Sequence, residues 1–240
     1  MKSMAVIATA AMYDAAFQAA RAIEYPTVDA FEQRMGYAID RSRLESAARV
    51  LACPLKTNPP HWQHGRVLYA AARNYWGSAW TGAGACLDIG TAKGFSALVL
   101  EWAGRDAGVP CLVRSVDVID PNATVLRNTV AECDGPKTLA EILSPWPEAA
   151  EIGFEQATGV EYLHRWMFRW NIAFIDGKHS GSVVTQEGTL LAQRQEPGDL
   201  AIFDDCQIRD VSMAVESLRE FYCFDSLTAG PREYAIGRRR

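Results

Sequence analysis

The stretch Leu87–Leu98, with the sequence Leu-Asp-Ile-Gly-Thr-Ala-Lys-Gly-Phe-Ser-Ala-Leu, decides the fold of this chain. It leaves an apolar run, passes through two glycines and continues as an apolar helical pattern. A strand that turns through glycines into a helix is typical of the first unit of a parallel α/β sheet. Gly90 and Gly94 let the backbone turn tightly and approach a ligand closely. The stretch therefore predicts a strand over Cys86–Ile89, a ligand-binding turn and a helix over Phe95–Ala103.

Further apolar runs alternate with helical patterns as far as the C-terminus. The expected strands after the first are Leu112–Val116, Ile152–Ala157, Ile172–Ile175 and Leu200–Phe203, followed by a hairpin of Phe224–Leu227 with Tyr234–Ile236 across Gly230-Pro231. Strands that alternate with helices favour a parallel sheet. The pattern predicts a Rossmann-like, doubly wound α/β sheet of five parallel strands, closed by a C-terminal antiparallel hairpin.

Helical periodicity accounts for most of the intervening segments. The helix that begins at Phe95 should end at Gly104, and Asn122 is expected to cap the next one. The apolar face of that second helix would consist of Val125, Leu126, Thr129, Val130 and Cys133. The later segments are expected to be a less regular insertion over Pro136–Ala150, a short helix before Trp170, a helix through Leu190-Leu191, and a helix over Val211–Phe221.

The first part of the chain has a different sequence pattern, which predicts helices and no strands. The expected helices are Met12–Ile23, Val28–Met35 and Arg41–Leu51, and the proline-rich stretch Pro54–Pro60 separates them from a helix over Gly65–Trp76. We therefore expect residues 1–60 to be a helical N-terminal extension and residues 61–240 to be the α/β domain. The extension would either cover the functional site or form a surface for homo-oligomer formation.

Composition and charge limit the kinds of molecule that this protein is expected to bind. The 240 residues carry a formal charge of −5, and the one basic cluster, Arg238-Arg239-Arg240, is expected to be a solvated tail. Nucleic-acid binders usually present a basic face, so a nucleic-acid partner is disfavoured. The six cysteines are scattered singly, which excludes a disulfide framework or a paired zinc site and indicates a reducing cytoplasm. No stretch approaches the roughly 20 apolar residues of a membrane span. A small molecule is the expected partner.

The glycine turn differs from two common nucleotide-binding motifs. It lacks both the Gly-x-Gly-x-x-Gly of dinucleotide binders and the phosphate loop that ends in Gly-Lys-Ser/Thr. Asp88, two residues before Gly90, is unsuited to a pyrophosphate but suits a cationic amino group. Asp117 ends the second strand, where a carboxylate can accept both hydroxyls of a ribose. An ordinary strand–helix turn and a surface aspartate are the simpler interpretations of these two features.

Three carboxylates follow the fourth and fifth strands. Asp176 follows Ile172–Ile175, and Asp204 and Asp205 follow Leu200–Phe203. Adjacent parallel strands lie about 4.8 Å apart, so these side chains would share one crevice. Crowded carboxylates repel one another unless a cation neutralises them, and hard oxygen ligands suit Mg²⁺ or another divalent cation. An Asp-Gly turn at Asp176 and a solvated acidic loop at Asp204-Asp205 are the alternatives.

The stretch Leu87–Leu98 resembles the first motif of class I S-adenosylmethionine-dependent methyltransferases. It is most similar to the branch that includes the catechol and caffeoyl-CoA O-methyltransferases, and the resemblance extends from about Gln63 to the C-terminal hairpin. It implies that S-adenosyl-L-methionine is bound with its ribose on Asp117 and its adenine beside Thr158-Gly159. The residues expected beside the methionine part and the methyl group are Asp88, Gly90, Thr91, Ala92, Gly94, Phe95, Ser96 and Asp176.

The resemblance also bears on the metal and the base. Asp176, Asp204 and Asp205 fall where metal-dependent O-methyltransferases hold Mg²⁺, and the Asp-Asp pair is more similar to the macrocin O-methyltransferase type. His179 stands where catechol-type enzymes have a catalytic lysine and macrocin-type enzymes a histidine. We therefore expect His179 to be the general base for an acceptor hydroxyl on a sugar, a catechol or another vicinal diol. His61 and His64 are expected to serve helix packing.

Three other functions are compatible with these residues. The same fold could methylate without a metal, with the aspartates only shaping the pocket. A nicotinamide-dependent oxidoreductase is disfavoured by the missing Gly-x-Gly-x-x-Gly motif. A protein that binds S-adenosylmethionine without catalysis is the third alternative, because residues 1–60 match no motif and because fold alone does not settle function.

Overall fold

A single seven-stranded sheet organises the chain in the computed structural model, which describes residues 8–56, 59–77 and 80–240. The strands are β1 (Gly84–Ile89), β2 (Cys111–Asp117), β3 (Gly153–Gln156), β4 (Ile172–Ile175), β5 (Leu200–Phe203), β6 (Tyr222–Ala229) and β7 (Arg232–Arg239). Their order is β3-β2-β1-β4-β5-β7-β6, and β1 to β5 are parallel. β7 pairs antiparallel with both β5 and β6. The predicted five parallel strands and C-terminal hairpin are confirmed.

The strand order places the switch point of the sheet between β1 and β4. From β1 the chain moves outward to β2 and β3, and then returns to β4 on the other side of β1. Ligands of doubly wound sheets bind beyond the carboxyl ends of the strands at such a point, because neighbouring loops there diverge. The ends of β1 and β4, Ile89 and Ile175, are directly paired in the sheet. The topology therefore positions the glycine turn beside the residues that follow β4.

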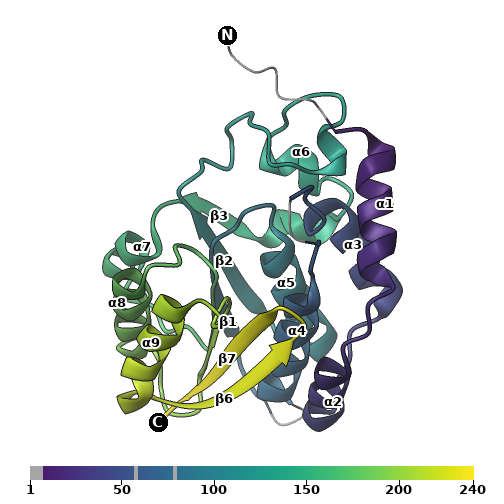
Figure 1. Cartoon of the computed structure of the whole chain (residues 1–240). Coiled ribbons are helices and arrows are strands. Elements are labelled where there is room, and N and C mark those ends of the chain that lie inside the picture. The colour runs from purple at the N-terminus through teal and green to yellow at the C-terminus, as the bar shows by residue number, and fades with distance from the viewer. Residues whose placement is uncertain (1–7, 57–58, 78–79) are drawn as a thin grey trace.

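Helices cover both faces of the sheet (Figure 1). One layer contains α4 (Gln63–Trp76) and α5 (Phe95–Ala107), with α1 (Ala10–Arg21), α2 (Pro26–Met35) and α3 (Arg41–Leu51) outside them. The other layer contains α7 (Gly159–Arg165), α8 (Gly181–Ala192) and α9 (Arg209–Ser217). The remaining helices are α6 (Leu139–Leu143) and the short 3₁₀ turns η1 (Val130–Glu132), η2 (Pro147–Glu151) and η3 (Leu218–Glu220).

Each face of the sheet has its own apolar core, because alternate strand residues point to opposite faces. The helices of the N-terminal segment join the first core: Phe31 and Leu44 are buried in the same cluster as Leu68 and Leu98. A buried ion pair adds to this contact, since Arg66 of α4 donates to Glu32 of α2. Among the described residues no helix combines the length and apolar composition that a membrane crossing requires.

The helix predicted after Asn122 is wrong. Only Val130–Glu132 forms a short 3₁₀ turn, Asn128 has a left-handed backbone (φ 58°) and Leu126 is 55% exposed. Tertiary contacts replace the helical hydrogen bonds. The Asn128 side chain accepts the Tyr13 hydroxyl hydrogen at 2.7 Å and bonds both backbone groups of Leu55, which ties this segment to the N-terminal one.

Two further expectations are corrected. α5 continues through Gly104 to Ala107 and ends at Gly108, which has a left-handed backbone (φ 69°). Gly104 is instead a place of close packing, where a Cβ would lie 2.8 Å from the Cβ of Cys111. The terminal arginines are no free tail, since β7 extends to Arg239, whose guanidinium donates to the Phe221 carbonyl at 3.0 Å.

Candidate active site

The glycine turn between β1 and α5 lies against the chain that follows β4. Gly90 has a left-handed backbone (φ 104°), and a Cβ there would collide with the carbonyl oxygen of Asp176 and lie 3.0 Å from the Gly177 nitrogen. The Gly90 N–H donates to the Val116 carbonyl at 2.9 Å, which closes the turn over the end of β2. Only glycine meets both conditions, because any side chain would push the two loops apart.

Asp88 lies beneath this turn, fully buried at the end of β1. The Ser115 hydroxyl donates to one carboxylate oxygen at 2.5 Å and is itself bonded to the Thr91 hydroxyl at 2.6 Å. The other oxygen has no partner among the described residues. Burial raises the pKa of Asp88 to about 7, against the opposing effect of hydrogen bonds from Ser115 and Ser96. The turn thus covers an acidic group that a nearby cation would stabilise in its ionised form.

Asp117, the last residue of β2, is held in place by the turn. One carboxylate oxygen accepts the Ala92 N–H at 2.9 Å, and the other accepts the Ile119 N–H at 3.0 Å. Each oxygen keeps a further lone pair, so this fixed carboxylate can still accept ribose hydroxyls.

Thr158 and Gly159 follow β3 and begin α7. Thr158 is the N-cap: its hydroxyl accepts the Glu161 N–H at 3.2 Å, and Glu161 accepts the Thr158 N–H at 3.0 Å. Gly159 is buried against Glu187, and a Cβ there would collide with the Glu187 carboxylate. Both residues therefore have structural roles, whatever their contact with an adenine.

The acidic residues after β4 and β5 meet as the strand order requires. Ile175 pairs with Phe203, and the Asp204 N–H donates to the Ile175 carbonyl at 3.1 Å. One ligand atom each of Asp176, His179 and Asp205 lies within 4.8 Å of the others. The His179 Nε2 is 3.3 Å from a carboxylate oxygen of Asp205. Asp204 is not part of this group.

Arg232 pairs with both Asp204 and Asp205. Its guanidinium reaches from β7 into the acidic cluster, 2.9 Å from Asp204 and 3.0 Å from Asp205. Asp204 also accepts the N–H of Asp205, whose backbone is left-handed (φ 56°), and of the two carboxylates only that of Asp205 also pairs with His179. Burial raises the pKa of Asp204 to about 6, and Arg232 opposes the rise.

Asp176 differs from its neighbours because no described residue donates a hydrogen bond or forms an ion pair with its carboxylate. Burial raises its pKa well above the ordinary value, and the charge of Asp204 adds to the effect. Sequence reasoning did not identify Arg232. Its one signal is a basic residue directly after the hairpin turn Gly230-Pro231, in a chain that must neutralise three clustered carboxylates.

His61 and His64 serve packing, as expected, although both also line the site. The His61 Nε2 bonds the Ala229 carbonyl at 3.0 Å, and burial lowers its pKa to about 4, helped by the charge of Arg232. The His64 ring stacks on Phe174 with ring centroids 5.9 Å apart. Its pKa lies well below the ordinary value because it is buried. Neither ring is suited to carry a proton at neutral pH.

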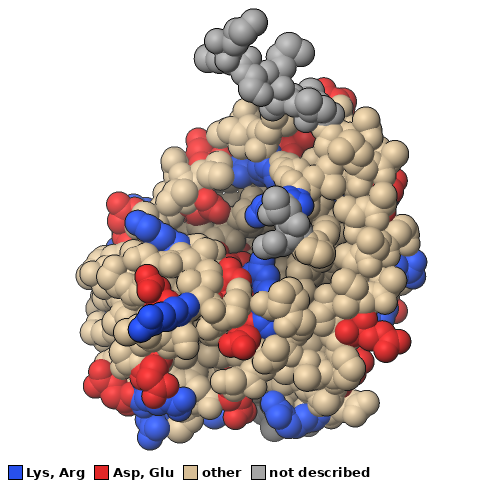
Figure 2. Space-filling model, in the orientation of Figure 1, with Lys and Arg blue, Asp and Glu red and all other residues tan. Residues whose placement is uncertain are grey.

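The glycine turn, Asp176, Arg232, His61 and His64 line a cavity of about 240 Å³. Its floor is the glycine turn with Asp176, and its walls come from Arg232 and from the segment between α3 and α4, including Lys56 and His61. Figure 2 shows a hollow near the centre of this face, with acidic and basic side chains at its walls. The cavity therefore extends from the glycine turn to Asp176, one member of the acidic group.

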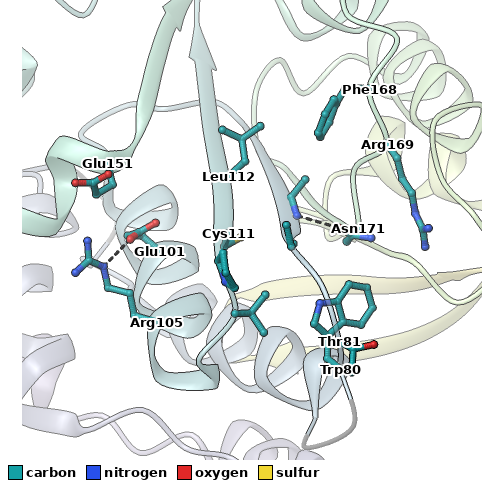
Figure 3. Close-up of a pocket in the computed structure, with 15 residues that line it drawn as sticks. Trp80, Thr81, Glu101, Arg105, Cys111, Leu112, Glu151, Phe168, Arg169 and Asn171 are labelled. Atoms are coloured by element: carbon teal, nitrogen blue, oxygen red, sulfur yellow. Dashed lines mark hydrogen bonds and ion pairs between the residues drawn. The ribbon is translucent and has the colours of Figure 1, made fainter.

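A larger hollow of about 900 Å³ lies at the opposite ends of the strands (Figure 3). It is lined by Gly84 and Ala85 at the start of β1, by Cys111 and Leu112 at the start of β2, and by residues such as Trp80 and Asn171. Its acidic Glu101 is already paired with Arg105 at 2.6 Å. Because ligands of such sheets bind beyond the carboxyl ends, its size alone does not make it the active site.

Replacing Asp88 by Asn should stabilise the ligand-free protein above pH 7 and change little near pH 4. The raised pKa means that the folded state retains a proton which the unfolded chain releases, so the wild type loses stability as the pH rises from about 4 to 7. The gain should be on the order of 2–4 kcal/mol. Urea unfolding at several pH values measures it, with the exposed Asp225→Asn as control. Parallel curves for Asp88→Asn and wild type would contradict it.

Comparisons with known proteins agree with this geometry. No protein-family profile matches the chain, and no curated protein matches it in sequence. An O-methyltransferase from Bacillus cereus in complex with SAH has a similar structure, with a TM-score of 0.55 and 13% identity over 91% of this chain and 93% of that one. The O-methyltransferase TomG from Streptomyces achromogenes, in complex with SAM, has a TM-score of 0.56 and 13% identity, covering 84% and 91%.

The same fold occurs in a protein with a different type of acceptor. An rRNA methylase from Streptococcus thermophilus has a TM-score of 0.50 and 9% identity over 71% of this chain and 95% of that one. At these identities the likeness establishes the fold and leaves the acceptor open. The sheet order, the glycine turn and these structures together show that the chain has the fold of the class I S-adenosylmethionine-dependent methyltransferases.

Proposed function

We propose that this protein is an S-adenosylmethionine-dependent O-methyltransferase that methylates a hydroxyl of a small molecule with the help of a divalent cation. The observation that carries the proposal is the convergence of Asp176, Asp205 and His179 directly beside the glycine turn. Solved structures of this fold bind SAM or SAH, which supports the cofactor.

The cofactor side of the cavity fits a cationic nucleoside. The Gly90 turn leaves the backbone uncovered, Asp117 offers a fixed carboxylate for a ribose, and Asp88 places an incompletely satisfied acid beneath the turn. S-adenosylmethionine combines an adenosine with a sulfonium and an ammonium group, and the methyl group leaves from the sulfonium. In this proposal Asp88 acts through its charge, because its side chain is buried under the turn.

The acidic side fits a divalent cation. Among the described residues three carboxylates face one guanidinium, so ionisation of all three leaves two negative charges in excess. The Asp176 carboxylate has no hydrogen-bond or ion-pair partner among the described residues. Asp205 presents its second carboxylate oxygen toward His179. Asp176 and Asp205 would hold the ion, while Asp204, bonded to Arg232, fixes the position of Asp205. A bound divalent cation lowers the pKa of an acceptor hydroxyl and fixes its direction.

In this proposal His179 takes the proton from that hydroxyl. The side chain is 39% exposed and pairs with Asp205, which orients the ring. The chain's other contribution is alignment, because the turn and the acidic group are joined at the contact of Gly90 with Asp176.

Methylation without a metal is the second candidate, and Arg232 is the observation that favours it. Its guanidinium already offers a cation to Asp204 and Asp205, and an arginine remains charged at every relevant pH. In this case the aspartates would shape the pocket, and His179 alone would activate the acceptor.

Cofactor binding tests the central part of the proposal. The wild type should bind S-adenosylhomocysteine, and Asp117→Asn should weaken binding by roughly 10- to 100-fold, since a charged acceptor contributes about 1.5–3 kcal/mol. Asn retains an acceptor for the Ala92 N–H, so the turn should stay intact. Calorimetric titration measures both affinities, with Asp225→Asn as the matched control. Absence of binding to the wild type would refute the cofactor assignment.

Metal removal separates the two candidates. In the metal-assisted reaction a chelator should abolish methyl transfer and Mg²⁺ should restore it. Mn²⁺ binding, followed by electron paramagnetic resonance, should be weakened at least about 10-fold by Asp176→Asn, because that variant removes the one carboxylate without a competing partner. Full turnover in chelator would establish the reaction without a metal.

A substitution of His179 tests whether this residue is a general base or a metal ligand. His179→Ala should lower the maximal rate by about 10²–10⁴-fold while the affinities for S-adenosylhomocysteine and Mn²⁺ change little. Exposed His164→Ala is the control. Loss of Mn²⁺ binding in His179→Ala would instead make this histidine a metal ligand, as the arrangement with Asp176 and Asp205 also allows.

A further inference from the structure

Two lysines line the cavity without an acidic partner. Lys93 lies within the glycine turn and is half-buried, and the exposed Lys56 lies in the segment between α3 and α4. Neither forms an ion pair or a side-chain hydrogen bond with any described residue. Both line the same cavity as Asp176, so they share one space with the proposed reaction centre.

The environment of Lys93 is unfavourable for an ammonium group that has no acidic partner. Burial lowers its pKa to about 8, and the positive charge of Lys56 lowers it further. Glu132 is the acid whose charge acts against this shift, but its two oxygens already accept the backbone N–H groups of Arg127 and Thr129 at 2.5 and 2.8 Å. Partly desolvated cations in proteins are normally paired, so this arrangement is costly in the absence of an anion.

Arg127 adds a third positive charge on the same side. Its guanidinium donates to the carbonyl oxygens of Ala92 and Asp120 and forms no ion pair with a carboxylate in the part of the chain that the structure describes. The whole chain has a net charge of −5, so its overall composition does not explain this local excess of positive charge. Ammonium groups on two walls of a cavity match the oxygens of a carboxylate or a phosphate.

We propose that Lys56 and Lys93 form an anion-binding subsite, and that the methyl acceptor carries a carboxylate or phosphate in addition to its hydroxyl. This assignment of the substrate class rests on the proposed methyltransferase function. The anionic group binds between the two lysines, and the hydroxyl reaches the Asp176 end of the same cavity. The lysines are thus specificity-determining residues contributed by the glycine turn and the N-terminal segment.

The carboxylate of the cofactor's own methionine part is the other source of such an anion. The ammonium group beside that carboxylate has Asp88 as its proposed counterpart, so the lysines match either anion. The two sources share one chemistry, and the experiment distinguishes them.

The test titrates inorganic phosphate into the full-length protein saturated with S-adenosylhomocysteine, by calorimetry. Lys56→Met and Lys93→Met should each weaken phosphate binding by about 10-fold or more, and Lys93→Arg should retain most of it because the charge is kept. Lys137→Met is the matched control, since Lys137 is paired with the exposed Asp134. Equal phosphate affinity in wild type and both methionine variants overturns the subsite.

A second titration identifies the source of the anion. S-adenosylhomocysteine should bind Lys93→Met as tightly as the wild type, and so should methylthioadenosine, which lacks the amino-acid part. A loss of affinity for S-adenosylhomocysteine alone assigns Lys93 to the cofactor and overturns the acceptor class. If the wild type binds phosphate but not S-adenosylhomocysteine, the proposed function fails while the anion subsite stands.

Discussion

The contact between Gly90 and the backbone of Asp176 is the constraint on which the site depends. β1 and β4 are neighbours at the switch point, and the loops that leave them can approach this closely only because Gly90 lacks a Cβ. One side of the contact carries Asp88 and the turn that holds Asp117; the other carries the acidic group. Any side chain at this position would separate the cofactor-type turn from the carboxylates, and alignment of the two parts is what a methyl-transfer site must supply.

The same corner of the molecule concentrates charge that a purely structural core would avoid. Asp88, Asp176 and Asp204 all have raised pKa values because they are buried, and Arg232 only partly offsets the cluster. Buried charges that lack full compensation cost stability and are typical of functional sites. Their counterparts are Arg232 for Asp204 and, in the proposed function, a sulfonium or ammonium for Asp88 and a divalent cation for Asp176 together with Asp205.

The parts of the cavity that would select an acceptor come from outside the parallel sheet. Lys56 and His61 belong to the segment between α3 and α4, and Arg232 belongs to the C-terminal hairpin. Two O-methyltransferases and an rRNA methylase have a similar fold. Differences in acceptor must therefore arise from such added walls, since function depends on the site that a fold carries.

The sequence alone determined the strands, the glycine turn and the acidic residues at the strand ends. β4 and β5 have the predicted boundaries, because a buried parallel strand is a short apolar run that ends abruptly at polar residues. Tertiary structure decided the rest. The helix expected after Asn122 is replaced by contacts of Asn128 with Tyr13 and Leu55, which local periodicity does not encode.

The composition of the acidic group was also settled by the tertiary structure. Asp204 and Asp205 are adjacent in sequence and equivalent by residue type, and Arg232 reaches both from a strand that is 28 and 27 residues away. The left-handed backbone at Asp205 then directs the second carboxylate to His179. Residue type and spacing identify which side chains reach the end of a strand, whereas their pairing depends on distant charges that only the folded chain brings together.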